Sequence, residues 1–265
     1  MTVINDIFKK EKPLIGMVHL LPLIGTPYYD NKNTPEMIEE AALKEAIKLK
    51  EAGFDGILFA NEGDRPYLNT VGPEVISLYS RIVTVVSKEV NLPFGLGVLM
   101  DPYATLAMGK TLDAAFVRMY LSGVFAGTFG LQAMVPGEVM HYRKRIEAMN
   151  LPIFCNVTPH AGVSLDSRDI IEIVDSMILM LEPEVILIPG PRAGLPPKIS
   201  MVAKLKDKFP EQEIIISSGI SLENIKDALN VSDGVIVGTS LKKDNILWNP
   251  IDEEKAKRFV ESVKG

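Results

Sequence analysis

The sequence predicts an α/β fold, a single (β/α)8 TIM barrel over residues 1–265. The chain has 265 residues, which is a typical length for one such barrel. Eight short apolar segments each precede a segment with helical periodicity, and this alternation indicates a parallel sheet covered on both faces. An open doubly wound sheet is the alternative. Eight complete units, with no GxGxxG motif near the start, favour the closed barrel.

The predicted strands are short apolar runs that end in polar or glycine-containing turns. They cover residues 14–18, 56–60, 92–100, 115–119, 153–157, 184–188, 214–216 and 235–237. Periodicity and capping signals predict helices at residues 34–53, 73–90, 104–112, 136–149, 166–182, 200–209, 221–230 and 253–263. A short helix across residues 5–12 is expected to cover the barrel floor, and residues 121–135 are predicted to be a Gly-rich loop.

The composition excludes several classes of function. The formal net charge is -6 without a long run of one sign, so nucleic acid is not predicted as a partner. No apolar run approaches the roughly 20 residues that cross a bilayer, and the N-terminus lacks the apolar core of a signal peptide. We therefore expect a cytoplasmic protein without a membrane span. A homo-oligomer remains open.

Metal and cofactor sites are not indicated. Cys155 is the single cysteine and lies inside an apolar run, which is typical of a buried, inert thiol. The three histidines, His19, His141 and His160, lack HxH or HExxH spacing. The sequence therefore predicts neither a metal nor a cofactor.

The strongest signal for a ligand site lies in residues 214–242. Two consecutive predicted strands end in small turns, and each turn leads into the start of a helix. Glycine lets backbone amides approach an anion closely, and the loops after strands seven and eight of such a barrel often bind phosphate. Tight turns also use these residue types without a ligand. The predicted phosphate-binding residues are Gly190, Ser218, Gly219, Gly238, Thr239 and Ser240.

Reactive groups of such a barrel lie on the loops after the strands. This rule selects His19, Asn61, Glu62, Asp64, Asp101, Asn156, His160 and Arg192. Because imidazole and carboxyl groups serve as general acids and bases, we predict catalytic roles for His19, Asp101 and His160. Substrate-binding roles are predicted for Asn61, Asp64, Arg118, Asn156 and Arg192. A structural role is the alternative for each of them.

Arg118 and Asp101 illustrate these alternatives. Arg118 interrupts an apolar strand, and a buried arginine requires a partner. We expect Arg118 to point into the barrel and to pair with a ligand anion or a carboxylate. Asp101, on the neighbouring strand, is the expected internal partner, but it precedes Pro102 and can instead cap the following helix.

The chain also resembles a known family. Residues 12–23, KPLIGMVHLLPL, are similar to the opening signature of the BtpA family, which includes SgcQ-type proteins. The resemblance covers nearly the whole chain and implies a (β/α)8 barrel. One branch of the family is linked to photosystem I accumulation in cyanobacteria, and SgcQ-like members occur among carbohydrate-uptake genes. Further matches are residues 52–56, Asn61 with Gly63 and Asp64, Tyr142 with Arg143, Ser218 and Gly219 with Asn224, and residues 237–242.

The chain departs from the family pattern at polar positions. Where members tend to read Glu-Asn-Phe-Gly-Asp, residues 60–64 read Ala-Asn-Glu-Gly-Asp. Family charges are also replaced at Met100, Thr128 and Pro159. These departures remove charged groups from the mouth, which implies a different substrate or no chemistry at all.

Two classes of function follow. The first is an enzyme, isomerase-like or lyase-like, that acts by acid/base chemistry on a small phosphorylated metabolite, with a sugar phosphate as one candidate. The second is a non-catalytic binding or assembly factor that uses the barrel as a scaffold. The turns in residues 214–242 favour the first class, and the missing charges favour the second.

Overall fold

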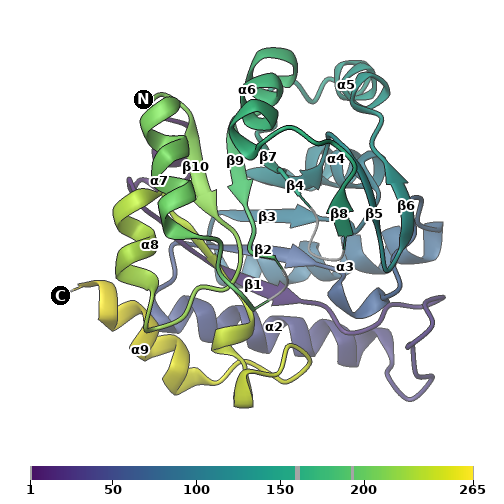
Figure 1. Cartoon of the computed structure of the whole chain (residues 1–265). Coiled ribbons are helices and arrows are strands. Elements are labelled where there is room, and N and C mark those ends of the chain that lie inside the picture. The colour runs from purple at the N-terminus through teal and green to yellow at the C-terminus, as the bar shows by residue number, and fades with distance from the viewer. Residues whose placement is uncertain (1, 159–161, 192–193, 265) are drawn as a thin grey trace.

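The computed structural model describes residues 2–158, 162–191 and 194–264, and its centre is a closed parallel barrel (Figure 1). β1 pairs with β2 on one side and with β11 on the other, so the sheet has no free edge. The predicted fold is confirmed. The barrel strands are β1 (Leu14–His19), β2 (Gly56–Ala60), β3 (Phe94–Gly97), β4 (Phe116–Tyr120), β7 (Ile153–Asn156), β9 (Val185–Ile188), β10 (Glu213–Ile216) and β11 (Val235–Val237).

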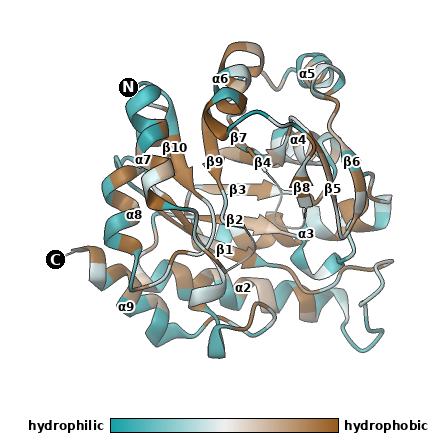
Figure 2. Ribbon diagram, in the orientation of Figure 1, coloured by the Kyte–Doolittle hydropathy of each residue, from teal (hydrophilic) through white to brown (hydrophobic). Residues whose placement is uncertain are grey.

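Helices cover the outside of the barrel, and the strands between them are apolar on both faces (Figure 2). Four of the helices begin with proline, whose fixed φ and missing N–H suit the first helical position. Among the described residues, no helix is both long enough and apolar enough to cross a membrane. The outer helices are α2 (Pro35–Ala52), α3 (Pro73–Val90), α4 (Pro102–Thr111), α5 (Pro136–Arg145), α6 (Ile170–Leu181), α7 (Ile199–Lys208), α8 (Ile225–Val231) and α9 (Glu253–Lys264).

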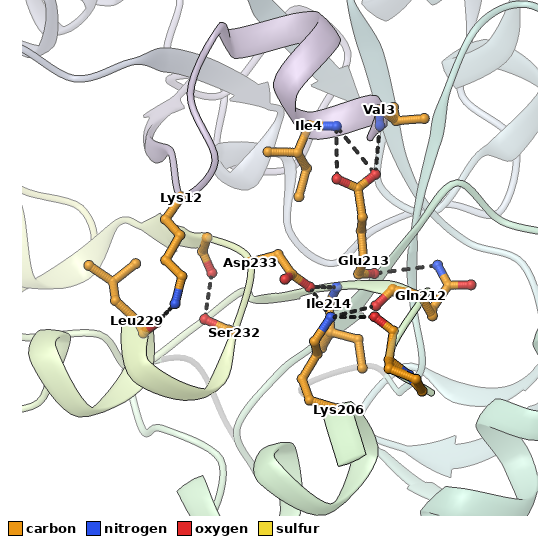
Figure 3. A network of polar contacts seen from close by, with 12 residues as sticks. Val3, Ile4, Lys12, Lys206, Gln212, Glu213, Ile214, Leu229, Ser232 and Asp233 are labelled. Atoms are coloured by element: carbon orange, nitrogen blue, oxygen red, sulfur yellow. Dashed lines mark hydrogen bonds and ion pairs between the residues drawn. The ribbon is translucent and has the colours of Figure 1, made fainter. Parts of the chain in front are cut away.

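A short helix, α1 (Val3–Phe8), closes the floor of the barrel as expected, although it begins and ends earlier than the sequence suggests. Ile4 and Phe8 are buried against the apolar side chains that fill the barrel. Glu213 at the start of β10 accepts hydrogen bonds from the backbone N–H groups of Val3 (2.8 Å) and Ile4 (3.0 Å) (Figure 3). These bonds satisfy amides that a helix start leaves without partners, so they fix α1 to the sheet.

A small antiparallel sheet stands beside the mouth, where the sequence predicts only loops. It consists of β5 (Val124–Gly127), β6 (Gly130–Ala133) and β8 (Gly162–Ser164), in the order β6-β5-β8. Strands of three or four residues that contain glycine give too short an alternation to indicate a strand. β5 and β6 pair with each other directly across a short turn, and β5 also pairs with β8, which lies more than thirty residues away in the chain. Residues 121–135 are therefore a hairpin and not a loop.

Candidate functional site

The interior of the barrel changes from apolar to polar toward the carboxyl ends of its strands. Alternate residues of each strand point inward, and those in the lower layers form a closed apolar core. The last inward position of several strands is polar, so a polar layer lies at the mouth. On β1, β4 and β7 the apolar inward residues are Ile15, Met17, Phe116 and Phe154, and the polar ones are His19, Arg118 and Asn156.

Three buried side-chain atoms in the polar layer lack hydrogen-bond partners. Within the described ranges, these atoms are Nδ1 of His19, Nδ2 of Asn156 and Oγ of Ser217. Buried polar groups in folded proteins nearly always have partners, because leaving one unpaired costs about 1–3 kcal/mol. All three come from strand ends at one end of the barrel. They mark the mouth as the part of the molecule that is suited to a polar ligand.

A cavity of about 260 Å³ opens at this polar layer, and we name it the mouth cavity. Tyr67 and Phe129 meet above it with their ring centroids 5.2 Å apart, so the β5–β6 hairpin contributes to its wall. Its polar lining includes His19, Glu62, Arg118, Ser217, Ser218, Gly219, Gly238 and Thr239.

One wall of the mouth cavity is stabilised by contacts of Gly190, Ser218 and Gly219. The Ser218 hydroxyl accepts from the Gly190 amide (2.7 Å) and donates to the Leu195 carbonyl (3.3 Å). A Cβ on Gly219 would lie 2.0 Å from the backbone of Leu195 and Pro196, and Gly219 has a φ of +70°. Glycine is therefore required there by close backbone packing.

A second cavity of about 420 Å³, which we name the outer cavity, is lined by the loops that follow β10 and β11 and by side chains of α9. Gly219, Gly238 and Thr239 line both cavities, so these predicted phosphate-binding residues lie together. Ser240 lines the outer cavity, but its hydroxyl donates to the Ile220 carbonyl (2.6 Å). The two loops that follow β10 and β11 therefore form one continuous strip, which we name the glycine strip (Ser218, Gly219, Gly238 and Thr239).

His19 lies next to the glycine strip. A Cβ on Gly238 would come within 2.9 Å of Cε1 of His19, so the ring directly faces that loop. Burial, followed by the positive charges of Lys242 and Arg118, lowers the pKa of His19 well below its ordinary value. The imidazole is therefore neutral near pH 7, so one of its nitrogens can accept a hydrogen bond while the other donates one.

Glu62 lines the mouth cavity, and sequence reasoning assigned it no role. Burial raises the pKa of Glu62, and the opposing effects of Arg118 and Tyr67 are smaller. Glu62 follows the end of a predicted strand, so its position indicates a site residue. The family pattern has a carboxylate at residue 60, and comparison with it therefore emphasises the carboxylate missing at Ala60 over the one present two residues later.

Replacing Glu62 with glutamine is expected to stabilise the chain at high pH. The raised pKa means that the folded chain loses stability as the pH rises from the ordinary value of 4.5 toward the folded pKa. We expect the Tm of Glu62→Gln to exceed that of the wild type by about 2–4 °C at pH 8, which corresponds to roughly 1 kcal/mol. The difference should shrink as the pH approaches 5. Thermal unfolding across this range measures it.

Glu89→Gln is the matched control, because it removes one carboxylate from an exposed position on α3. Its Tm should follow that of the wild type at every pH. A Glu62→Gln chain that melts below the wild type at pH 8 would instead show that the ionised carboxylate stabilises the fold through Arg118.

Asn61 and Asp64 have structural roles in this fold. Asn61 accepts from the Leu99 amide (2.8 Å) and donates to Asp64 (2.9 Å), and Asp64 accepts from the Leu23 amide (2.8 Å). Both side chains are buried and neither lines the mouth cavity. They join the loops after three neighbouring strands, so the structure places them behind the site and not in it.

Asp101 and Arg118 are not partners, contrary to the expectation. Asp101 is the N-cap of α4 and accepts from the amides of Tyr103, Ala104 and Val71, each at 3.0 Å. Its carboxylate oxygens are therefore occupied by backbone donors. Arg118 lines the mouth and donates to Oδ1 of Asn156 (2.9 Å). The amide of Asn156 thus orients the guanidinium of Arg118.

His160 and Arg192 lie outside the described residues, so their predicted roles stay predictions. Within the described ranges, no group of three or more His, Cys, Asp or Glu side chains is placed to hold a metal ion.

Comparisons with known proteins agree with this architecture. A model of the BtpA family matches residues 10–265. The putative sgc region protein SgcQ of Escherichia coli is 30% identical over 99% of this chain and 98% of its own length. The photosystem I biogenesis protein BtpA of Synechocystis is 29% identical over 97% of this chain and 89% of its own length.

Solved structures show the same barrel at low sequence identity. Phosphoribosyl anthranilate isomerase from Thermus thermophilus has a TM-score of 0.60 and 10% identity, over 95% of this chain and 98% of that one. This likeness concerns the fold. The family is shown by the match along nearly the whole sequence: the chain belongs to the BtpA family.

Proposed function

We propose that the chain binds a small phosphorylated molecule, with a sugar phosphate as one candidate, at the mouth of the barrel. The observation that carries this proposal is that two of the three unpaired polar atoms, on His19 and Ser217, belong to residues that line a cavity bordered by the glycine strip. A phosphate group at the strip would accept hydrogen bonds from its backbone amides.

Basic side chains from α9 support an anion at this place. Arg258 and Lys255 line the outer cavity, next to the glycine strip. Lys255 donates to the Lys242 carbonyl and to Asn245 (both 3.0 Å), so its position is fixed. Arg258 is exposed and makes no ion pair within the described residues, so its guanidinium is available for phosphate.

Acid/base chemistry on the bound molecule is the second part of the proposal. Neutral His19 can donate a hydrogen bond to the bound molecule, and Glu62, whose pKa burial raises, can exchange a proton with it. The two lie close together, because His19 pairs in register with Ala60, two residues before Glu62. This pair replaces Asp101 in the catalytic set, since the oxygens of Asp101 bind backbone amides. Isomerisation and lyase chemistry need such a pair.

A panel of phosphate esters tests the binding proposal. An ester present at about 100 times its Kd stabilises the folded chain by about 2.7 kcal/mol, which raises the Tm by roughly 5–10 °C. The same compounds without the phosphate are the control, and they should leave the Tm unchanged. If no ester shifts the Tm at millimolar concentration, the proposal is wrong.

A non-catalytic assembly factor is the second candidate, and one surface favours it. The outward face of the β5-β6-β8 sheet is apolar, with Leu131 66% exposed and Val163 68% exposed. Exposed apolar side chains gathered on one face are typical of protein contacts. Leu131→Lys should leave the Tm shift from phosphate esters intact if the two functions are separate.

A further inference from the structure

A third cavity, the side cavity of about 390 Å³, adjoins the mouth cavity. It lies between the loop after β1, the helix α2 and the segment that leads into α9. His19 and Leu247 line both cavities, so these two residues form the boundary between them. A ligand that extends from the glycine strip past His19 would therefore enter the side cavity.

Arg65 lies in the wall of the side cavity between two aromatic rings. Its Cζ is 4.3 Å from the ring centroid of Tyr28 and 3.6 Å from that of Trp248. Both rings contact the guanidinium, and these contacts restrict its orientation. Within the residues that the structure describes, Arg65 makes no hydrogen bond and no ion pair. A guanidinium held in one plane is prepared to bind an oxyanion with two parallel hydrogen bonds.

The charge of the side cavity is opposite to that of the whole chain. The chain has a net charge of -6, whereas the lining of this cavity contains four basic side chains and one acidic one. The acidic one, Glu45, forms a buried ion pair with Lys242 at 2.5 Å. An anion is therefore favoured in the cavity, and a cation is not. The basic residues are Lys44, Lys48, Arg65 and Lys242.

We infer that the side cavity binds a second oxyanion of the same ligand, a carboxylate or a second phosphate group, through the N–H edge of Arg65. The ligand then has an anionic group at each end, with one phosphate on the glycine strip and the other group on Arg65. Its middle atoms lie beside His19, at the boundary of the two cavities. This inference rests on the proposed function, because the glycine strip must bind the first phosphate.

Matched series of ligands test the inference. The probes are phosphate monoesters of straight-chain alcohols with two to six carbons, the same monoesters ending in a carboxylate, and the corresponding bisphosphates. Calorimetry gives the Kd, and the fluorescence of Trp248, the single tryptophan, reports on the side cavity. At one chain length, we expect a doubly anionic ligand to bind at least tenfold more tightly than the alcohol ester and to change the emission. The series that shows this tighter binding, carboxylate or bisphosphate, identifies the second anionic group of the ligand.

Variants of Arg65 test whether this residue causes the preference for doubly anionic ligands. Arg65→Met keeps an unbranched side chain between Tyr28 and Trp248 but removes the charge, and it should reduce the tenfold preference to less than twofold. Arg65→Lys keeps a charge without the planar fork and should lose most of the preference. Lys88→Met is the control, because it removes one charge from an exposed position in the last turn of α3, and Lys88 lines none of the three cavities. It should keep most of the preference.

The outcomes separate the two proposals. If alcohol esters bind but no second anionic group improves binding, the role of Arg65 is wrong and the proposed function stands. The same holds if the preference survives in Arg65→Met or is lost equally in Lys88→Met. If no phosphorylated compound of any series binds the wild type, the proposed function is wrong and the inference fails with it.

Discussion

Replacing Gly238 with aspartate is expected to abolish the Tm shift that phosphate esters produce. The new carboxylate would lie on the glycine strip, where its charge repels phosphate. Its Cβ would also come 2.9 Å from Cε1 of His19 and 3.3 Å from Cγ of Met17. These neighbours are side-chain atoms that can move, so the chain should still fold. Differential scanning with and without ester measures the loss, and we expect less than one tenth of the wild-type shift.

Gly137→Asp provides the control for this change. Gly137 lies in the first turn of α5, and a Cβ there meets no atom within 4 Å. The variant adds the same charge at an open position, where a helix start tolerates it well, so it should keep the full shift. A Gly238→Asp chain that keeps the shift as well would show that the ligand binds elsewhere.

Replacing Gly219 with alanine is expected to cause a large loss of stability. The added Cβ would lie 2.0 Å from the carbonyl carbon of Leu195 and from the nitrogen of Pro196, which are backbone atoms. Left-handed backbone costs about 1–2 kcal/mol for a residue with a side chain, and overpacking adds about 1–3 kcal/mol. We therefore expect the free energy of unfolding to fall by about 2–5 kcal/mol. Urea denaturation with an unchanged m-value measures this loss.

Gly130→Ala separates the two causes. Gly130 has a similar φ of +79° at the turn of the β5–β6 hairpin, but a Cβ there meets no atom within 4 Å. This variant should therefore lose only the backbone contribution of about 1–2 kcal/mol. Equal losses in Gly130→Ala and Gly219→Ala would contradict the close packing of Gly219 against residues 195 and 196.

The barrel could be predicted from the sequence because its signals are local. Each strand is an apolar run, and four helices begin with proline at the position where proline is favoured. The β5-β6-β8 sheet could not be predicted in the same way. Its β5–β6 hairpin is short, and the β5–β8 pairing joins residues more than thirty positions apart, a partner that no local pattern indicates.

The candidate site could be predicted only in part. Alternation along β1 and β4 correctly indicates that His19 and Arg118 point into the barrel, because side-chain direction has a strict period of two in a strand. In the loop after β2, no such period applies. Asn61 accepts a hydrogen bond from the Leu99 amide while Glu62 faces the cavity, and that difference depends on a contact between segments that follow different strands. The stacking of Tyr28, Arg65 and Trp248 likewise joins three distant segments.

The apolar floor of the barrel stabilises the fold, whereas the polar side chains at the mouth can change without disturbing that floor. The apolar interior, with α1 fixed to Glu213 beneath it, contains none of the polar side chains of the mouth. Substitutions in the polar layer thus leave the lower core unaltered, and removing an unpaired buried group there can even relieve a cost. New specificities could therefore arise in relatives through single steps at the mouth while the chain continues to fold.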